Sequence, residues 1–239
     1  MDTALFIFHD QLNDFLVKSR RGGPIVTPCK GNPTIKHLTE ALGVPHVEVG
    51  LVKVNGNDSG LGYRVQTGDR VEIRPALPGC PVEARFLLDN HLGRLTVYLR
   101  LLGFDCLYRS AWQDDQLAEI AAGEGHILLT RDRRLLMRKV ILYGYCVRAL
   151  EPELQVKEVV HHFDLTDRIL PFQRCLRCNG KLKPVSKADV LERLEPLTQK
   201  YYEEFSICTE CDQVYWKGSH YERMLGWIDR IQNPPGGAH

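Results

Sequence analysis

Two pairs of cysteines, each pair separated by two residues, give the clearest chemical signal in the sequence. The pairs are Cys175/Cys178 and Cys208/Cys211. Two such knuckles can offer four thiolates to one tetrahedral ion, which is the pattern of a zinc ribbon. Four sulfur ligands leave no open coordination position, so we expect a structural zinc ion. The alternative is a pair of disulfides, and the absence of a recognisable signal peptide argues against it.

Three aspartates form a second candidate site. Each follows a short apolar segment that is expected to be a strand: Asp89 after 85–88, Asp114 after 105–108, and Asp132 after 127–130. Ligands of open parallel sheets gather at the carboxyl ends of the strands, so we expect the three carboxylates at one edge. Such carboxylates repel one another unless a cation lies between them, and oxygen ligands suit Mg²⁺ or Mn²⁺. An ion of this kind can activate water against a phosphodiester.

Basic residues surround the last of these aspartates. Five cations lie within nine residues, namely Arg131, Arg133, Arg134, Arg138 and Lys139. Guanidinium groups are good phosphate partners, so the cluster indicates a nucleic-acid contact. The alternative is that each aspartate, Asp114 and its neighbour Asp115 included, caps a helix and that the basic run is a solvated face. Capping would be the better explanation for one acid, whereas acids at three successive strand ends favour the metal site.

The segment 83–165 supplies the elements that must position these acids. Strands are expected at 85–89, 105–108, 127–130 and 144–150. Between them we expect a helix with Leu92, Leu95, Leu99 and Leu102 on one face, a helix that starts at Asp114, a short helix near 135–139, and a closing helix at 153–163. This alternation is typical of a parallel sheet with flanking helices.

The first 80 residues have a different pattern. Strands or extended segments are expected at 4–8, 24–26, 47–49, 51–54 and 69–73, with a short helix or turn at 12–15, a helix at 34–42 and a hairpin turn at Asn55-Gly56. This order predicts a small α+β grasp. Pro75, Pro78, Gly79 and Pro81 then predict a linker.

Composition sets the remaining limits. The chain has 239 residues, enough for two or three modules, and 31 basic residues against 30 acidic ones. The chain's net charge is too small to attract a polyanion, so a local patch of basic residues would have to bind one. With no signal peptide and no apolar run long enough for a membrane span, we expect a cytoplasmic protein. Cys106 and Cys146 lie in apolar runs and are expected in the core.

Several motifs together resemble a known nuclease family. They are Phe-Leu-Leu-Asp at 86–89, Leu-Gly-Arg-Leu at 92–95, the run at 99–105, Leu-Leu-Thr-Arg-Asp-Arg at 128–133, the run at 171–175, and Tyr-Trp-Lys-Gly-Ser-His-Tyr at 215–221. The combination resembles the PIN-like ribonuclease family named after the C-terminal domain of the mutator-seven exonuclease. Segments 12–16, 41–46 and 68–71 are similar to the ubiquitin-like β-grasp module that precedes this nuclease in bacterial members.

The resemblance implies a fold and an activity. It implies an α/β, PIN-like parallel sheet at 83–168, a ubiquitin-like β-grasp domain at 1–80, a zinc ribbon at 169–230, and a disordered tail at 231–239. It also implies a metal-dependent ribonuclease whose catalytic acids map onto Asp89, Asp114 and Asp132, with Asp115 as a substitute for Asp114. Members often use a fourth acid, and Glu119 is the candidate here, although a solvent-facing helix residue is the simpler explanation.

Candidate RNA contacts complete the prediction. They are Arg94, Arg131, Arg133, Arg134, Lys217 and His220. Asn90 and His91 follow Asp89 directly and are further candidates for contact with metal or phosphate. We expect a structured RNA as substrate, with tRNA as the example, because a compact RNA can touch three modules at once. A non-catalytic RNA- or ribosome-associated adaptor that binds through the ribbon is the alternative, and metal-dependent cleavage of RNA separates the two.

Overall fold

The computed structural model describes residues 2–80 and 82–233. The chain divides into two compact units, Met1–Pro78 with Ala111–Arg148, and Gly79–Ser110 with Ala149–His239. The first unit therefore combines the expected grasp with part of the expected nuclease segment. The second unit holds the rest of that segment and the ribbon.

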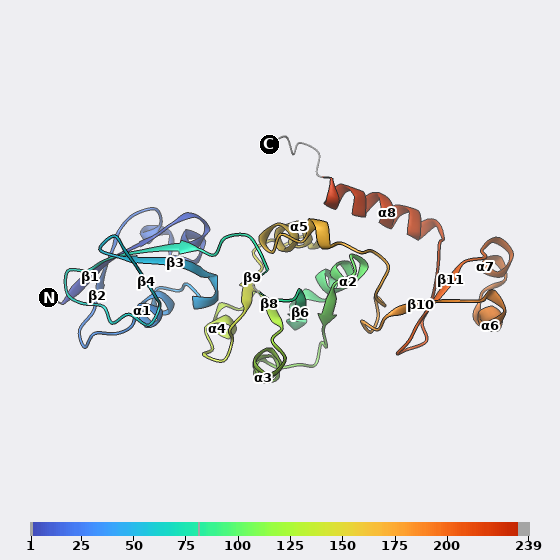
Figure 1. Cartoon of the computed structure of the whole chain (residues 1–239), viewed down its shortest axis with the longest axis horizontal. Coiled ribbons are helices and arrows are strands. Elements are labelled where there is room, and N and C mark those ends of the chain that lie inside the picture. The colour runs from blue at the N-terminus through green and yellow to red at the C-terminus, as the bar shows by residue number, and fades with distance from the viewer. Residues whose placement is uncertain (1, 81, 234–239) are drawn as a thin grey trace. The chain divides into compact units, whose positions relative to one another are not determined.

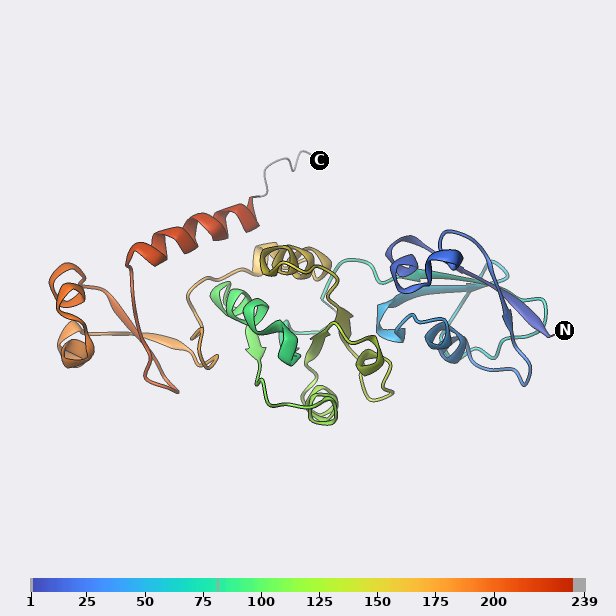
Figure 2. The same cartoon turned by 180° about the vertical axis from the view of Figure 1, so that it is seen from behind.

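A five-stranded sheet forms the core of the first 78 residues. Its strands are β1 (Thr3–Phe8), β2 (Ile25–Pro28), β3 (Val49–Val54), β4 (Asn57–Ser59) and β5 (Arg70–Pro75), in the order β2-β1-β5-β3-β4. The central pair β1/β5 is parallel and the other pairs are antiparallel. Helix α1 (Ile35–Ala41) lies against the sheet in both views (Figure 1 and Figure 2). The expected α+β grasp is confirmed.

Local chemistry explains the elements of this module. The Thr34 side chain accepts a hydrogen bond from the backbone N–H of His37 at 3.2 Å, which caps α1. The 3₁₀ helix η1 (Asp10–Phe15) occupies the expected turn and buries Leu12 and Phe15. The segment 47–49 was expected to be extended, but η3 (His46–Glu48) is a 3₁₀ turn that buries Glu48. Strand β4 was not expected, because its three polar residues carry no apolar alternation.

The remainder of the first unit alternates helix and strand. It comprises α3 (Asp114–Glu124), β8 (Ile127–Thr130), α4 (Arg133–Leu136) and β9 (Gly144–Cys146). All four residues of β8 are buried, and β8 pairs with β9 in parallel. Helix α4 begins two residues before the expected 135–139, because Asp132 caps it. Strand β9 ends four residues before the expected limit of 150.

The second unit contributes the other half of the alternating pattern. It contains β6 (Arg85–Leu88), α2 (Gly93–Leu101), β7 (Asp105–Leu107) and α5 (Pro152–His162). Strands β6 and β7 pair in parallel, as β8 and β9 do in the first unit. The four leucines expected on one helix face, at positions 92, 95, 99 and 102, are all fully buried. Helices α2 and α5 lie side by side (Figure 1 and Figure 2).

The ribbon is a three-stranded antiparallel sheet with helical additions. Strands β10 (Leu182–Val185), β11 (Phe205–Cys208) and β12 (Val214–Trp216) pair in that order. Helices α6 (Lys187–Val190) and α7 (Pro196–Tyr201) fill the long interval between the cysteine knuckles. A small core of Val190, Leu194, Phe205 and Val214 supports them. Helix α8 (Ser219–Gln232) reaches into the expected tail, whose residues 234–239 lie outside the described part of the chain.

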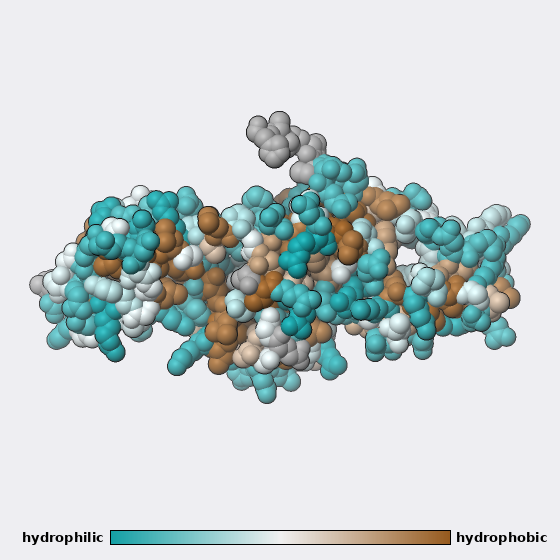
Figure 3. Space-filling view, in the orientation of Figure 1, coloured by the Kyte–Doolittle hydropathy of each residue, from teal (hydrophilic) through white to brown (hydrophobic). Residues whose placement is uncertain are grey.

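The surface and core follow the expected division of residue types. Hydrophilic residues cover most of the face seen in Figure 3, with hydrophobic residues exposed in patches between them. Cys106 and Cys146 are buried, as expected, and burial raises the pKa of the Cys106 thiol. Across residues 2–80 and 82–233, every helix is too short or too polar to cross a bilayer.

Candidate functional site

The four knuckle cysteines come together at the base of the ribbon. Their sulfur atoms lie within 4.8 Å of one another, with Cys175 Sγ 3.6 Å from Cys211 Sγ and Cys178 Sγ 3.4 Å from Cys208 Sγ. Four soft ligands at this mutual distance fit one tetrahedral zinc ion. The residue after each knuckle, Asn179 (φ 77°) or Asp212 (φ 55°), adopts the left-handed conformation that turns the chain back. The thiol cluster is therefore suited to a structural metal.

Hydrogen bonds favour the thiolate at Cys175, whereas burial raises the pKa of Cys178 and of Cys211. Burial alone would raise the pKa of Cys175, but the Tyr215 hydroxyl, 3.2 Å from its sulfur, and nearby backbone N–H groups lower that pKa to about 6. The Tyr215 oxygen in turn accepts the backbone N–H of Leu176 at 3.1 Å. A thiolate present at neutral pH is the form that binds zinc.

The first knuckle is tied to strand β7 and helix α2 by a buried polar network. The guanidinium of Arg100, 4 % exposed, donates to the carbonyl of Cys106 on β7 and to the carbonyls of Leu176 and Arg177 within the knuckle. The Asn179 side chain accepts the Cys106 N–H at 2.9 Å and donates to Asp105 at 2.6 Å. The knuckle is thus part of the same hydrogen-bonded structure as β7.

Asp89 is the buried member of the expected catalytic acids. It directly follows β6 and is 5 % exposed. The Oδ1 atom of its neighbour Asn90 is buried and has no hydrogen-bond partner within the described residues, while the Asn90 carbonyl accepts the Tyr108 hydroxyl at 3.0 Å. A buried carboxylate and a buried amide oxygen on consecutive residues are the oxygen donors that a hard cation such as Mg²⁺ prefers. Their donor chemistry is therefore compatible with a metal, whereas among the described residues the cysteine cluster is the group whose ligand atoms lie close enough to share one ion.

Asp114 and Asp115 occupy the first turn of α3 and differ in their surroundings. Gln113, not an aspartate, is the N-cap, and the Gln116 side chain accepts its backbone N–H at 3.1 Å. Capping therefore does not explain Asp114, which is exposed. Asp115 forms an ion pair with Arg138 at 2.5 Å. This contact gives Asp115 a structural role and makes Asp114 the better ligand candidate of the two.

Asp132 both ends the β8 loop and caps α4. Its Oδ1 accepts the backbone N–H of Arg134 at 2.7 Å, and its own N–H donates to the Thr130 hydroxyl at 2.9 Å. The side chain is exposed. One carboxylate oxygen can serve the cap while the other faces a ligand, so capping and metal binding are compatible for this residue.

The expected RNA contacts divide into engaged and exposed residues. Arg133 donates to the carbonyl of Phe15 at 2.9 Å, and Lys217 forms an ion pair with Glu204. His220 is exposed, with its Nδ1 atom 3.5 Å from the Arg223 guanidinium. Two further residues, Arg131 and Arg134, have exposed side chains. Arg94 is also exposed and lines a cavity of about 760 Å³ between α2 and α5.

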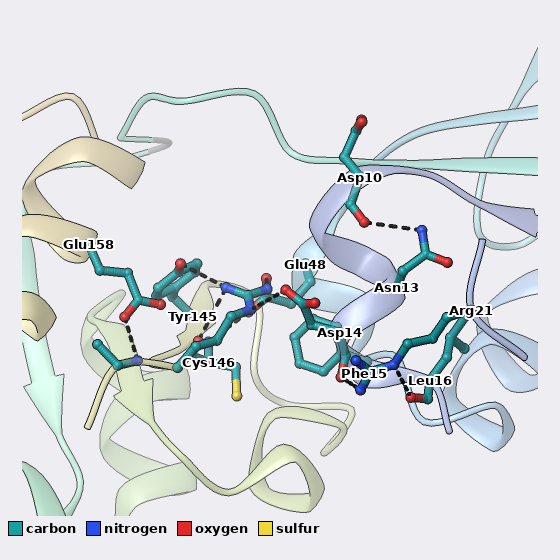
Figure 4. Close-up of polar contacts among 12 residues, drawn as sticks. Asp10, Asn13, Asp14, Phe15, Leu16, Arg21, Glu48, Tyr145, Cys146 and Glu158 are labelled. Carbon is teal, nitrogen blue, oxygen red and sulfur yellow. Dashed lines mark hydrogen bonds and ion pairs between the residues drawn. The ribbon is translucent and has the colours of Figure 1, made fainter. Parts of the chain in front are cut away.

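A junction within the first unit was missed by sequence reasoning. Glu48, 3 % exposed, accepts the Cys146 N–H at 2.6 Å and the Arg148 guanidinium at 2.9 Å. Arg148 also donates to the Tyr145 hydroxyl at 2.7 Å and lies over the Phe15 ring, 4.8 Å from its centre. Figure 4 shows Phe15, Glu48 and Tyr145 converging here. The available signal was a lone acid, Glu48, in an otherwise apolar stretch.

Comparisons with known proteins agree with this architecture. Residues 84–228 match the model of the Mut7-C RNAse domain, and residues 1–78 match that of the Mut7-C ubiquitin domain. No significant match was found among curated proteins or among solved structures. The first match spans more than half of the chain and includes the knuckle cysteines and every candidate catalytic acid. The chain therefore belongs to the Mut7-C RNAse domain family, with a Mut7-C ubiquitin-like module at 1–78.

Proposed function

We propose that the protein is a Mg²⁺- or Mn²⁺-dependent ribonuclease that hydrolyses phosphodiester bonds in a structured RNA, with tRNA as the example. The observation that carries this proposal is the buried carboxylate of Asp89, which follows a parallel strand of an RNase-family domain beside the buried Oδ1 of Asn90. An ordinary surface or capping role does not require an acid to be 5 % exposed.

The proposed roles follow from the chemistry of the side chains. Asp89, Asp114 and Asp132 would hold the divalent ion, which supplies an activated water and neutralises charge that develops on the phosphate. Asp115 is the substitute ligand, and it would have to give up its ion pair with Arg138 in order to bind the metal. Arg131 and Arg134, whose side chains are exposed, would hold substrate phosphates. Arg94 and His220 are further proposed contacts, whereas Arg133 and Lys217 would have to exchange existing partners to contact RNA.

The cysteine cluster supports the remaining parts of the proposal. We assign Cys175, Cys178, Cys208 and Cys211 to a structural zinc ion. Reduced thiolates are needed for this site, which agrees with a cytoplasmic location. The alternative function, a non-catalytic RNA-binding adaptor, rests on the aromatic and basic residues near β12. Under it, the buried carboxylate of Asp89 would have a structural role only.

Cleavage of a folded tRNA by the purified full chain tests the proposal. We expect cleavage with Mg²⁺ or Mn²⁺, loss of cleavage with a chelator, and faster cleavage of the folded RNA than of an unstructured RNA of equal length. Asp89→Asn should be inactive, while Asp58→Asn, an exposed acid on β4, should retain full activity. Equal activity of wild type and Asp89→Asn would overturn the catalytic assignment, and tight RNA binding without cleavage would favour the adaptor.

A further inference from the structure

The ubiquitin-like module reaches the loop that carries Asp132 through one side chain and one carbonyl. Arg133, the residue after Asp132 and the first of α4, donates from Nη1 to the Phe15 carbonyl at 2.9 Å. Its guanidinium also lies over the Phe15 ring, 5.0 Å from the ring centre. Both contacts involve the last residue of η1, so the module binds Arg133 at two points.

The Phe15 side of this contact is fixed by residues of the module and by Arg148, which follows β9. Phe15 is 4 % exposed, and its ring has a second guanidinium, that of Arg148, 4.8 Å from its centre. Arg148 is held in turn by the buried carboxylate of Glu48. Gly43, at φ +101°, leaves room for the Phe15 carbonyl, because a Cβ there would lie 3.2 Å from that oxygen. The module thus presents a rigid acceptor and a rigid ring.

The Arg133 side of the contact adjoins a proposed metal ligand. Asp132 opens α4, which is only four residues long, and its cap oxygen accepts the backbone N–H of Arg134, the residue after Arg133. The charge-assisted hydrogen bond and the cation–π contact, although Arg133 is exposed, act together to favour one conformation of its side chain. Fixing Arg133 therefore also limits where the Asp132 carboxylate can lie.

We propose that Phe15 is a positioning residue for the nuclease reaction and acts through Arg133 on the carboxylate of Asp132. The ubiquitin-like module is then a fixed part of the catalytic apparatus. This inference rests on the proposed function, because it assigns Asp132 to the metal site. It also explains why Arg133, alone among the three arginines next to Asp132, has its guanidinium held by the module in the described structure.

A double-mutant cycle on the full chain tests the inference. Phe15→Leu keeps an apolar side chain but removes the ring, and Arg133→Ala removes an exposed side chain with little risk to folding. We expect each to lower kcat about tenfold or more without changing the KM for RNA, and to raise the Mn²⁺ concentration needed for half-maximal rate. The double variant should be no slower than Arg133→Ala alone, because Arg133→Ala already removes both the hydrogen bond and the ring contact, and Phe15→Leu removes only the latter.

Two controls make the result specific. Val17→Ala, on an exposed neighbour in the same module, should match wild type in kcat and in metal requirement. Asp132→Asn sets the reference for loss of the ligand itself. If Asp132→Asn is inactive while the Phe15 and Arg133 effects multiply, are absent, or appear only in KM, the inference is wrong and the proposed function stands. If Asp132→Asn is fully active, the metal-ligand assignment of Asp132 fails and the inference fails with it.

Discussion

The carboxylate of Glu48 lies 2.9 Å from the guanidinium of Arg148, a residue one hundred positions later in the chain. The Glu48 side chain is 2 % exposed and the Arg148 side chain 23 %. Burial alone would lower the pKa of Arg148, but the charge and hydrogen bond of Glu48, together with Tyr145 and Cys146, outweigh that effect and raise it. The pair joins the ubiquitin-like module to the strand β9 region inside one compact unit, so it should contribute to the stability of both.

Glu48→Gln should therefore destabilise the protein. It removes the charge that compensates Arg148 and leaves the buried Cys146 N–H with a weaker acceptor. We expect a loss of about 1–3 kcal/mol, below the largest values for fully buried pairs because Arg148 is partly hydrated. Chemical denaturation measures this change. Asp58→Asn, which removes an exposed pair with Lys53, should change the free energy of unfolding by less than about 1 kcal/mol. Equal effects of both variants would contradict a special role of Glu48.

Asp132→Asn separates catalysis from capping. Asparagine caps helices as well as aspartate, so the hydrogen bond to Arg134 N–H and the melting temperature should be preserved. The lost charge removes a metal ligand, and we expect the cleavage rate to fall by about a hundredfold or more. Asp132→Ala should be equally inactive but less stable, because the cap is lost as well. An active Asp132→Asn protein would show that this residue only caps.

The exposed arginines should govern the salt dependence of RNA binding. A variant that makes one phosphate contact fewer releases fewer counterions when it binds RNA. Arg131→Ala and Arg134→Ala should therefore each weaken binding, and each should reduce the slope of log affinity against log salt by about one. Filter binding over a range of salt concentrations measures this slope. The control is Arg138→Ala, whose guanidinium is already paired with Asp115. Unchanged slopes in the first two variants would identify these residues as a solvated surface.

The sequence predicted those parts that depend on local patterns. The leucine spacing of α2, the apolar strand β8 and the cysteine knuckles each carry their signal within a few residues, and the structure confirms them. The start of helix α1 at Thr34, which is its N-cap, was also predicted from local pattern alone. Helix and strand limits were less accurate where a cap, such as Asp132, decided the boundary.

The junctions could not be predicted in the same way. The Arg133–Phe15 contact joins residues 118 positions apart, and Arg100 reaches the knuckle carbonyls 76 and 77 positions later. Neither arginine differs in local pattern from a surface residue. Partners of this kind are set by tertiary packing, which a basic side chain in a helix does not reveal. The local pattern predicts Arg133 as a phosphate contact, which stays a prediction, and gives no sign of its bond to the Phe15 carbonyl.

Loss of the zinc ion should destabilise structure beyond the ribbon. Cys208→Ser removes one of the four ligands, and we expect it to lose zinc and unfold the ribbon, because a metal supplies much of the stability of a small module. Arg100 and Asn179 connect the first knuckle to Cys106 on β7, so amide hydrogen exchange should also increase in β7. Exchange in β1 and β5 serves as the control and should stay at its wild-type level. An increase in amide exchange that is confined to residues after 180 would contradict this coupling.

Tyr215→Phe should change the pH at which zinc is released. The Tyr215 hydroxyl stabilises the thiolate of Cys175 and, against the effect of burial, helps to lower its pKa from 9.0 to about 6. The stability that this thiolate contributes is complete above its ordinary pKa and is lost as the pH falls through the lowered one. Without the hydroxyl the pKa of Cys175 rises, protons compete better with the metal, and zinc release should begin at a higher pH than in wild type.

Release of zinc can be followed with a chromophoric chelator during acid titration. Tyr221→Phe, whose ring packs on Phe172 away from the thiols, should release zinc at the wild-type pH. Identical release curves for all three proteins would show that the Tyr215 hydroxyl does not influence metal binding.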